Sequence, residues 1–309
     1  MTPGSNARLR LIGAAALFST GGMAIKACAL SGWQIAGLRS GVAAIALLLL
    51  LPGARAWPTK KEWLVGFGYA LTMVLFVVAN KLTTAANAIF LQSTAPLYIL
   101  LASPWLLGER IVRRDLVFLA TMALGLVLFF VDERHASAIA TNPFEGNVLA
   151  LASGVTWACT VMGLRWLGGS RVHEHDGQAP SEASRTRSAR GRGPGALVAG
   201  NAISCVVCVP FMTSLASATP IDWTIVFYLG VFQIALAYIL LTAGLRAVPA
   251  FEASVLLLVE PVLSPIWAWI VHGERPGPWA IAGGTILIVA TIGKTWWDVR
   301  PEPRAAASV

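Results

Sequence analysis

A series of long apolar runs constrains this chain more than any other feature. Each run is about 20 residues long, the length that an α-helix needs to cross the hydrocarbon core of a bilayer. The runs cover 9–30, 33–51, 62–80, 86–107, 114–131, 147–168, 195–215, 223–243, 251–271 and 278–297. Only 12% of the 309 residues are charged and 56% are hydrophobic, which lies far from the usage of soluble proteins. The sequence therefore predicts an all-α polytopic membrane protein with ten transmembrane helices.

The net charge of +8 follows membrane topology and does not indicate nucleic-acid binding. When the N-terminus is placed in the cytoplasm, the loops predicted to lie outside carry only Lys81, Arg134 and Arg275 as basic residues. Such an excess of inside cations fits the positive-inside rule. The first run is longer than a typical signal-peptide core, so we expect it to be retained. We predict a multi-pass protein of the bacterial inner membrane, with both termini cytoplasmic and the lipid bilayer as its partner.

The two halves of the sequence resemble each other. The segment TAPLYILLASPWLLGER (94–110) matches VEPVLSPIWAWIVHGER (259–275) at a constant separation of 165 residues, so that Pro96 pairs with Pro261. The first run matches the sixth at a separation of 139 residues, LFSTGGMAIK (17–26) against TWACTVMGLR (156–165). The two separations differ by the length of a polar insertion at 169–194, which is rich in Arg, Ser and Gly. This pattern predicts an internal duplication of five helices.

Because five is odd, the two halves cross the membrane in opposite orientations, which is the inverted-repeat architecture of many secondary transporters. Binding sites in such proteins lie near the midplane, where the repeats meet. We predict these parts of the chain: a cytoplasmic N-terminus (1–8), a first repeat (9–131), an external loop (132–146), a second repeat (147–297) that includes a cytoplasmic linker (169–194), and a cytoplasmic tail (298–309).

The motifs and their order resemble one transporter superfamily. LFSTGGMAIK lies in the first run, Arg39 lies early in the second, and P-(x11)-GER ends the fourth and ninth. This combination is similar to the drug/metabolite transporter superfamily, and within it to the ten-helix EamA-type exporters. The resemblance implies a central cavity formed largely by spans 1, 3, 4, 6, 8 and 9, with alternating access between the halves. Bacterial exporters of amino acids and metabolites are the class that fits best.

Glu260 is the most unusual residue of the ninth run. It follows Ala250 by ten residues, which places it about 15 Å into a core of about 30 Å. A charge at that depth costs several kcal/mol and usually faces a cavity or a partner. We predict that Glu260 contacts a substrate ammonium or carries a coupling proton. Two structural alternatives stay open, since Glu260 could brace the backbone freed by Pro261 or pair with a cation such as Arg39.

Pro96 and Pro261 occupy matching positions in the two halves. Proline removes a helical hydrogen bond and kinks the chain, and membrane proteins tolerate the freed groups where they line a cavity. The pairing predicts kinked helices that shape or gate the cavity. The alternative is that proline is simply common in membrane helices.

Several other polar or aromatic residues lie in the middle of predicted spans. A cavity for a small zwitterion needs a few convergent polar groups in a mainly apolar wall. We predict as substrate-binding residues Gln92, Trp157, Gln233, Tyr238, Ser19 and Thr20, in addition to Glu260. The alternative for each is a hydrogen bond between helices, worth about 0.6 kcal/mol on average.

Three further charged positions are better explained by structure. The family pattern favours a structural ion pair or a gate contact for Arg39. Lys26 lies close to a predicted helix end, where snorkelling explains it. In the second GER triplet, Gly273 is expected to end a helix and Glu274 to begin the next, where an acidic residue suits the positive helix end.

These features together predict a secondary transporter that exports small amino acids or related metabolites, neutral to hydrophobic ones first. A proton-coupled exporter of amphipathic cations is the alternative, and the coupling ion stays open. We expect no cofactor, because no G-x-x-x-x-G-K-[ST] signature is present, and no metal site, because Cys205 and Cys208 lack histidine partners. The spans carry no nucleophile–base set, so we predict no enzyme; a lipid-head-group carrier remains possible on this fold.

Overall fold

The computed structural model describes residues 3–106, 113–131, 140–169, 193–212, 215–244 and 256–299, and these residues form helices with short connections. The elements are α1 (Pro3–Ser19), α2 (Gly21–Ala27), α3 (Gly32–Leu50), η1 (Pro52–Arg55), α4 (Lys60–Leu82), α5 (Ala85–Gln92), α6 (Ala95–Leu106), α7 (Arg113–Val131), α9 (Pro143–Gly169), α11 (Pro194–Cys208), η2 (Val209–Phe211), α12 (Pro220–Tyr228), η3 (Leu229–Leu236), α13 (Ala237–Gly244), α15 (Val259–His272) and α16 (Pro278–Val299). The predicted all-α fold class is confirmed.

Capping boxes define where three of the helices begin. Ser31 caps α3, Thr59 caps α4 and Thr219 caps α12, each with its side chain accepting from the backbone N–H three residues later. In each case the third helical residue returns a hydrogen bond to the backbone N–H of the cap. These bonds satisfy amide donors that have no partner inside the helix.

Four of the predicted spans are interrupted or distorted near their middle. The first is broken at Thr20 between α1 and α2, and the fourth at Ser93 and Thr94 between α5 and α6. The eighth contains η3, a π-helical stretch, and α15 of the ninth begins only after Leu258. Side chains bond the backbone at the breaks: Ser93 Oγ donates to Ile89 O (2.7 Å) and Thr94 Oγ1 to Leu91 O (2.6 Å). In a membrane such irregular backbone persists only where protein groups or a cavity satisfy it.

The paired prolines lie beside these interruptions. Pro96 is the second residue of α6, and Pro261 is the third residue of α15. In the first turn of a helix a missing N–H needs no acceptor. Both spans are therefore irregular immediately before the paired prolines, at Ser93–Thr94 and at Leu258. The role of the two prolines in shaping or gating the cavity stays a prediction.

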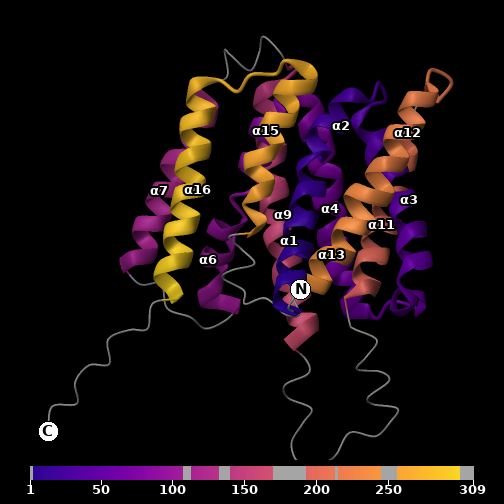
Figure 1. The fold of residues 1–309 in the computed structure, drawn as a ribbon, viewed down its shortest axis with the longest axis horizontal. Helices are drawn as coiled ribbons and strands as arrows, with labels where there is room; N and C mark the ends of the chain where they lie inside the picture. Colours follow the sequence, from indigo (N-terminus) through magenta and orange to yellow (C-terminus); the bar gives the residue numbers. More distant parts are fainter. Residues whose placement is uncertain are drawn as a thin grey trace, which may run out of the picture.

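The helices lie side by side in one bundle (Figure 1). On one side α7 packs on α16, and on the other α3 packs on α11. Between them α4 packs on α9 and α11, while α1 packs on α13 and α15, and α5 packs on α9 and α15. The central helices thus come from both halves of the chain.

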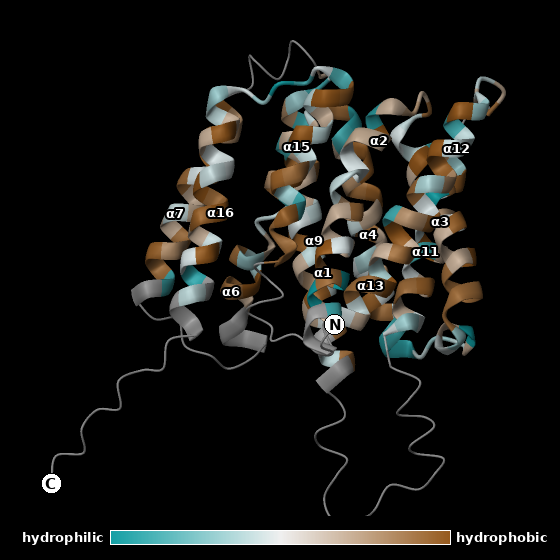
Figure 2. Ribbon diagram, viewed as in Figure 1, coloured by the Kyte–Doolittle hydropathy of each residue, from teal (hydrophilic) through white to brown (hydrophobic). Residues whose placement is uncertain are grey.

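The composition of the helices fits a membrane-spanning bundle. Hydrophobic residues run along most of the length of the helices (Figure 2), and large apolar side chains such as Leu49, Val206 and Ile221 are exposed on the outside. Among the described residues six helical segments are long and apolar enough to cross a membrane, and Asp115–Val131 and Pro278–Lys294 are shorter apolar helices. The count of ten crossings, the repeat boundaries and most of the linker at 169–194 stay predictions, since residues 170–192 lie outside the described part.

Candidate functional site

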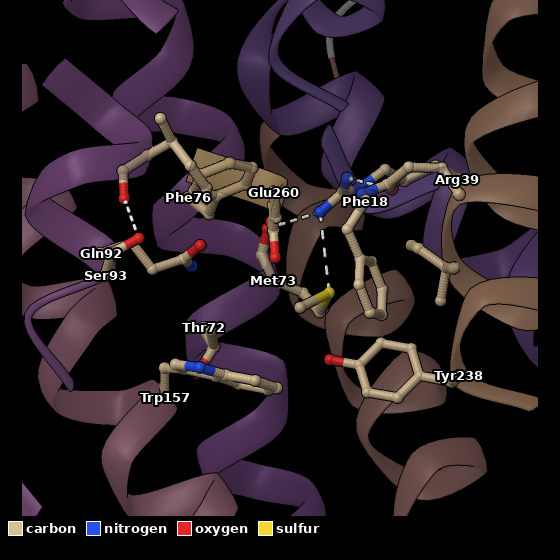
Figure 3. Close-up of a pocket in the computed structure, with 13 residues that line it drawn as sticks. Phe18, Arg39, Thr72, Met73, Phe76, Gln92, Ser93, Trp157, Tyr238 and Glu260 are labelled. Atoms are coloured by element: carbon tan, nitrogen blue, oxygen red, sulfur yellow. Dashed lines mark hydrogen bonds between the residues drawn. The ribbon is translucent and has the colours of Figure 1, made fainter. Parts of the chain in front are cut away.

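A small pocket lies at the centre of the bundle, where the interrupted spans meet (Figure 3). Its cavity volume is about 80 Å³, enough for only a handful of water molecules. Eight elements and the break after α5 supply its lining, which consists of Phe18, Arg39, Thr72, Met73, Phe76, Ile89, Gln92, Ser93, Trp157, Gln233, Ile234, Tyr238 and Glu260. The wall is mainly apolar and aromatic with a few polar groups, which is the usual composition of a small-molecule site.

The irregular backbone gathers around this pocket. Phe18 precedes the break of the first span, Ser93 lies in the break of the fourth, and Glu260 is in the first turn of α15. Gln233 and Ile234 belong to the π-helical stretch η3. π-Bulges are frequent at functional sites, and substrate sites of secondary transporters are typically formed by discontinuous helices. The arrangement makes this pocket the candidate site, because half-helix ends and irregular backbone meet there.

Glu260 reaches the pocket from the positive end of a helix. It is the second residue of α15, and twelve residues separate it from His272 at the far end, or roughly 18 Å along the axis. A carboxylate in the first turn of a helix is stabilised by the helix dipole. Its side chain is half-buried and makes no hydrogen bond or ion pair with any described residue. Neither the predicted backbone brace nor a pair with Arg39 is formed within the described part of the chain.

Arg39 enters the same pocket from α3 and is only 1% exposed. Nη1 donates to Gln233 Oε1 (3.2 Å), and Nη2 donates to Met73 O (3.2 Å) and faces Met73 Sδ at 3.7 Å. Its Nε has no hydrogen-bond partner. No carboxylate of the described residues lies within ion-pair distance, so the structural ion pair predicted for Arg39 is not formed there.

The structure brings five of the predicted substrate-binding residues into the pocket: Gln92, Trp157, Gln233, Tyr238 and Glu260. Gln92 Nε2 donates to Ser153 Oγ (3.1 Å), which leaves its carbonyl oxygen available. The Tyr238 ring meets the ring of Trp157 edge to face, with centroids 6.5 Å apart. Their role in binding stays a prediction, but the side chains share one cavity.

Ser19 and Thr20 are not among the lining residues. Ser19 is fully buried, donates to Ala16 O (2.7 Å) and accepts from Trp267 Nε1 (3.0 Å). Thr20 Oγ1 donates to Leu17 O (2.7 Å) and lies 2.8 Å from Tyr228 Oη. Both side chains thus hold the break of the first span and connect it to neighbouring helices, which matches the structural alternative.

Sequence reasoning missed several lining residues. Thr72, Met73 and Phe76 form one face of α4, and Phe18, Ile89, Ser93 and Ile234 complete the wall. Thr72 and Ser93 are polar residues in the middle of predicted spans, and this signal could have identified them. The apolar residues carry no such signal, because a hydrophobic side chain in a membrane helix suits lipid, core and cavity equally.

A second group of polar residues, which we call the outer cluster, lies at the end of the bundle predicted to face outside. It surrounds a cavity of about 390 Å³ and consists of Lys26, Asn80, Lys81, His272, Gly273 and Glu274. No group of three or more His, Cys, Asp or Glu side chains suited to a metal ion occurs among the residues that the structure describes.

Glu274 in the outer cluster joins separate parts of the chain. Gly273 ends α15 in the left-handed conformation (φ 66°), as predicted for the GER triplet. Glu274 Oε1 accepts from the backbone N–H of Ala85 (2.5 Å), the first residue of α5, and Oε2 lies 3.4 Å from Lys26 Nζ. The prediction that Glu274 starts its own next helix is wrong, because α16 begins at Pro278 and the carboxylate meets the N-terminus of α5 instead.

Comparison with known proteins agrees with this architecture. The model of the EamA-like transporter family matches residues 7–131 and 194–295, well over half of the chain. The chain belongs to this family. The predicted resemblance to the drug/metabolite transporter superfamily is therefore confirmed, and this EamA-like protein is a membrane transporter by family.

Two curated relatives and a solved structure were found for this EamA-like protein. It is 25% identical over 225 residues to the pseudopaline exporter CntI of Pseudomonas aeruginosa strain UCBPP-PA14, and 24% identical to that of strain PAO1, in each case over 72% of this chain and 70% of the relative. One crystal structure superposes on this protein with a TM-score of 0.62 and 19% sequence identity. The superposition covers 97% of this chain and 99% of the chain in that crystal structure. The latter likeness shows a shared fold.

Proposed function

We propose that this protein is a secondary transporter of the inner membrane that exports small amino acids or related metabolites by alternating access. The observation that carries the proposal is the central pocket, which combines an acidic, a basic and two amide side chains with an aromatic wall. Glu260 lies deep in the bundle, where an ionisable residue usually marks a transport pathway. The name of the curated relatives, an exporter, supports outward transport.

Alternating access requires two halves that can rock about a shared site. The contacts between helices are consistent with two such halves, because they are related in pairs. If each span is paired with the one five positions later, the contact of α4 with α9 corresponds to that of α13 with α1. The contact of α5 with α9 corresponds in the same way to that of α15 with α1, and α5 meets its own counterpart α15. We therefore propose an inverted repeat with its two-fold axis through the pocket, and with both termini cytoplasmic.

The cavity favours a small substrate. Its volume of about 80 Å³ suits a molecule of few non-hydrogen atoms, and larger substrates require the halves to separate. The polar groups can hold the charged ends of a zwitterion, while Phe18, Trp157 and Tyr238 offer apolar contact to a side chain. Neutral to hydrophobic amino acids match both properties.

One observation favours the second candidate, a proton-coupled exporter of amphipathic cations. The half-buried carboxylate of Glu260 shares the pocket with the aromatic rings of Phe18, Phe76, Trp157 and Tyr238. Aromatic faces and a carboxylate together attract organic cations. In that case Glu260 exchanges its proton for the substrate.

Transport by the purified protein in proteoliposomes distinguishes the two. The panel contains radiolabelled alanine, threonine, leucine and phenylalanine on one side and cationic dyes on the other, each with and without a pH gradient. We expect accumulation of at least one amino acid and no net proton movement driven by dye. No amino-acid transport combined with dye-driven proton movement establishes the second candidate and contradicts the first.

A further inference from the structure

Arg39 is a buried cation whose donors are only partly used. A guanidinium carries five N–H donors in a planar fork, and at Arg39 these meet the neutral acceptors Gln233 Oε1 and Met73 O and the sulfur of Met73. Nε has no acceptor, although the residue is only 1% exposed. Burying a guanidinium with no carboxylate in direct contact is costly, so its unused donor favours an anionic ligand.

The Arg39 side chain is directed at the cavity. It comes from α3 and ends near Phe18, Met73 and Glu260, in the same space that Glu260 reaches from α15 (Figure 3). Gln233 and Met73 hold the guanidinium from two different helices. Gln233 is itself packed against α2, because a Cβ on Gly21 would lie 2.8 Å from Gln233 Nε2. The guanidinium is therefore preorganised for a ligand.

The two lysines of the outer cluster do not offer a comparable anion-binding group. Lys26 is paired with Glu274 and donates to Thr83 O (2.8 Å), and Lys81 donates to Cys28 O (2.5 Å). Both lie in the outer cluster, away from the lining of the central pocket. Arg39 is thus the basic residue that lines the central pocket in the described part of the chain.

We propose that Arg39 binds a carboxylate of the transported substrate, while Glu260 takes its ammonium group or another hydrogen-bond donor. The pocket is then a two-ended site that selects zwitterions and other carboxylate-bearing molecules and rejects purely cationic ones. This inference rests on the proposed function and adds the chemical group that the substrate must carry. An arginine fork suits a planar carboxylate because two parallel N–H···O bonds form with correct geometry.

Matched ligands test the inference in the unmodified protein. Alanine, threonine and leucine are compared with their primary amides and methyl esters, which keep the ammonium group and side chain but lack the carboxylate. Binding is measured as ligand-induced thermal stabilisation of the purified full-length chain in detergent. We expect at least one acid to bind, with its amide and ester at least about tenfold weaker, since charge-assisted hydrogen bonds are lost.

Variants then assign the preference to Arg39. In Arg39→Gln the acid should lose at least about tenfold in affinity while the amide is unchanged, so that the preference disappears. Arg39→Lys should keep part of it, because the charge remains and the planar fork is lost. Arg55→Gln is the matched control, because Arg55 is exposed and donates to Leu48 O and Leu49 O at the end of α3; it should bind as the wild type does.

The outcomes separate the inference from the proposed function. Equal binding of acid and amide by the wild type overturns the role of Arg39 and leaves amino-acid transport standing. The same holds if the acid preference persists in Arg39→Gln. If the wild type binds no amino acid in either form, the proposed function is wrong and the inference falls with it. If Arg39→Gln does not fold, Arg39→Lys supplies the comparison, because an acid preference unchanged in that variant overturns the role of the guanidinium fork.

Discussion

The central pocket and the outer cluster both hold buried charges, but they satisfy them differently. In the outer cluster Glu274 meets Lys26 and the N-terminus of α5, and Lys81 and His272 meet backbone carbonyls. In the central pocket Arg39 meets only neutral acceptors, and Glu260 makes no hydrogen bond with any described residue. Charges that are paired within the protein hold helices together, whereas Arg39 and Glu260, which form no direct ion pair among the described residues, are available to a ligand.

The location of each group follows the same division. The outer cluster joins the ends of α2, α5 and α15, so its bonds connect elements from both halves at one surface of the bundle. The central pocket lies where spans are broken or π-helical, and there the backbone itself is not regular. A transporter needs both kinds of site, because it must close firmly at one end and bind reversibly in the middle.

The largest expected effect is on transport in Glu260→Gln. Removing the charge deprives the substrate of its counter-ion, so we expect transport to fall at least roughly 30-fold, equivalent to ~2 kcal/mol. Thermal stability without ligand should stay close to that of the wild type, since Glu260 has no described protein partner. Initial rates in proteoliposomes and unfolding in detergent measure the two effects, and wild-type transport in this variant would contradict the division of roles.

Glu274→Gln should have the opposite profile. It removes the ion pair with Lys26, so we expect a stability loss of about 1–3 kcal/mol. Substrate affinity at the central pocket should be unchanged. Asp115→Asn is a control for losing an ion pair elsewhere, because Asp115 bonds Lys294 (3.1 Å) between α7 and α16; it should also lower stability. A Glu274→Gln protein as stable as the wild type would show that the outer cluster does not hold the helices together.

A smaller effect is expected when the support of Arg39 is disturbed. In Gly21→Ala the new methyl group would lie 2.8 Å from Gln233 Nε2 and push the acceptor of Arg39 out of place. We expect apparent affinity to fall about 3- to 10-fold, because small misplacements of binding groups are costly. Gly13→Ala on α1 is the control, since its methyl group would lie 3.5 Å from Leu240 Cδ1 in ordinary contact. Equal affinities of the two variants contradict a supporting role for Gln233.

The smallest effect is expected at Ser19. Ser19→Ala removes the acceptor for Trp267 Nε1, a hydrogen bond between helices outside the pocket lining. Stability should fall by about 0.6 kcal/mol, the average for such bonds. Transport should remain within about twofold of the wild type, as expected for such a small structural change. A transport loss as large as that of Glu260→Gln would return Ser19 to the list of substrate contacts.

Some residues of the pocket could be predicted from the sequence, because they are polar residues within membrane-spanning runs. Glu260, Gln92 and Gln233 are costly in a bilayer unless a cavity or partner receives them, so their presence in apolar runs indicates a pocket. The bilayer also explains the all-helical fold. Its hydrocarbon core offers no hydrogen-bond partners, and an α-helix satisfies its backbone groups within one segment. Long apolar runs predicted the all-helical fold, and polar residues within those runs predicted five of the residues that line the pocket.

The differences between expectation and structure depend on information that a linear pattern does not contain. Whether Thr20 faces the cavity or Tyr228 is decided by the rotation of a helix that breaks at that residue. Pro261 was expected to disturb the ninth span, and the structure places the irregular backbone at Leu258, just before the helix that contains Pro261. The partner of Glu274 is the amide of Ala85, more than a hundred residues away in the sequence. Only the packed bundle shows these three arrangements.

Ligand-induced thermal stabilisation of Glu260→Gln and Glu274→Gln, measured side by side, tests the central claim most directly. Each purified protein is unfolded with and without a saturating concentration of the amino acid that the wild type binds best. We predict that Glu260→Gln keeps the ligand-free melting temperature of the wild type and loses the shift caused by ligand, whereas Glu274→Gln melts earlier and keeps that shift. If Glu260→Gln melts early and still responds to ligand, the unpaired carboxylate serves the fold and does not bind the substrate.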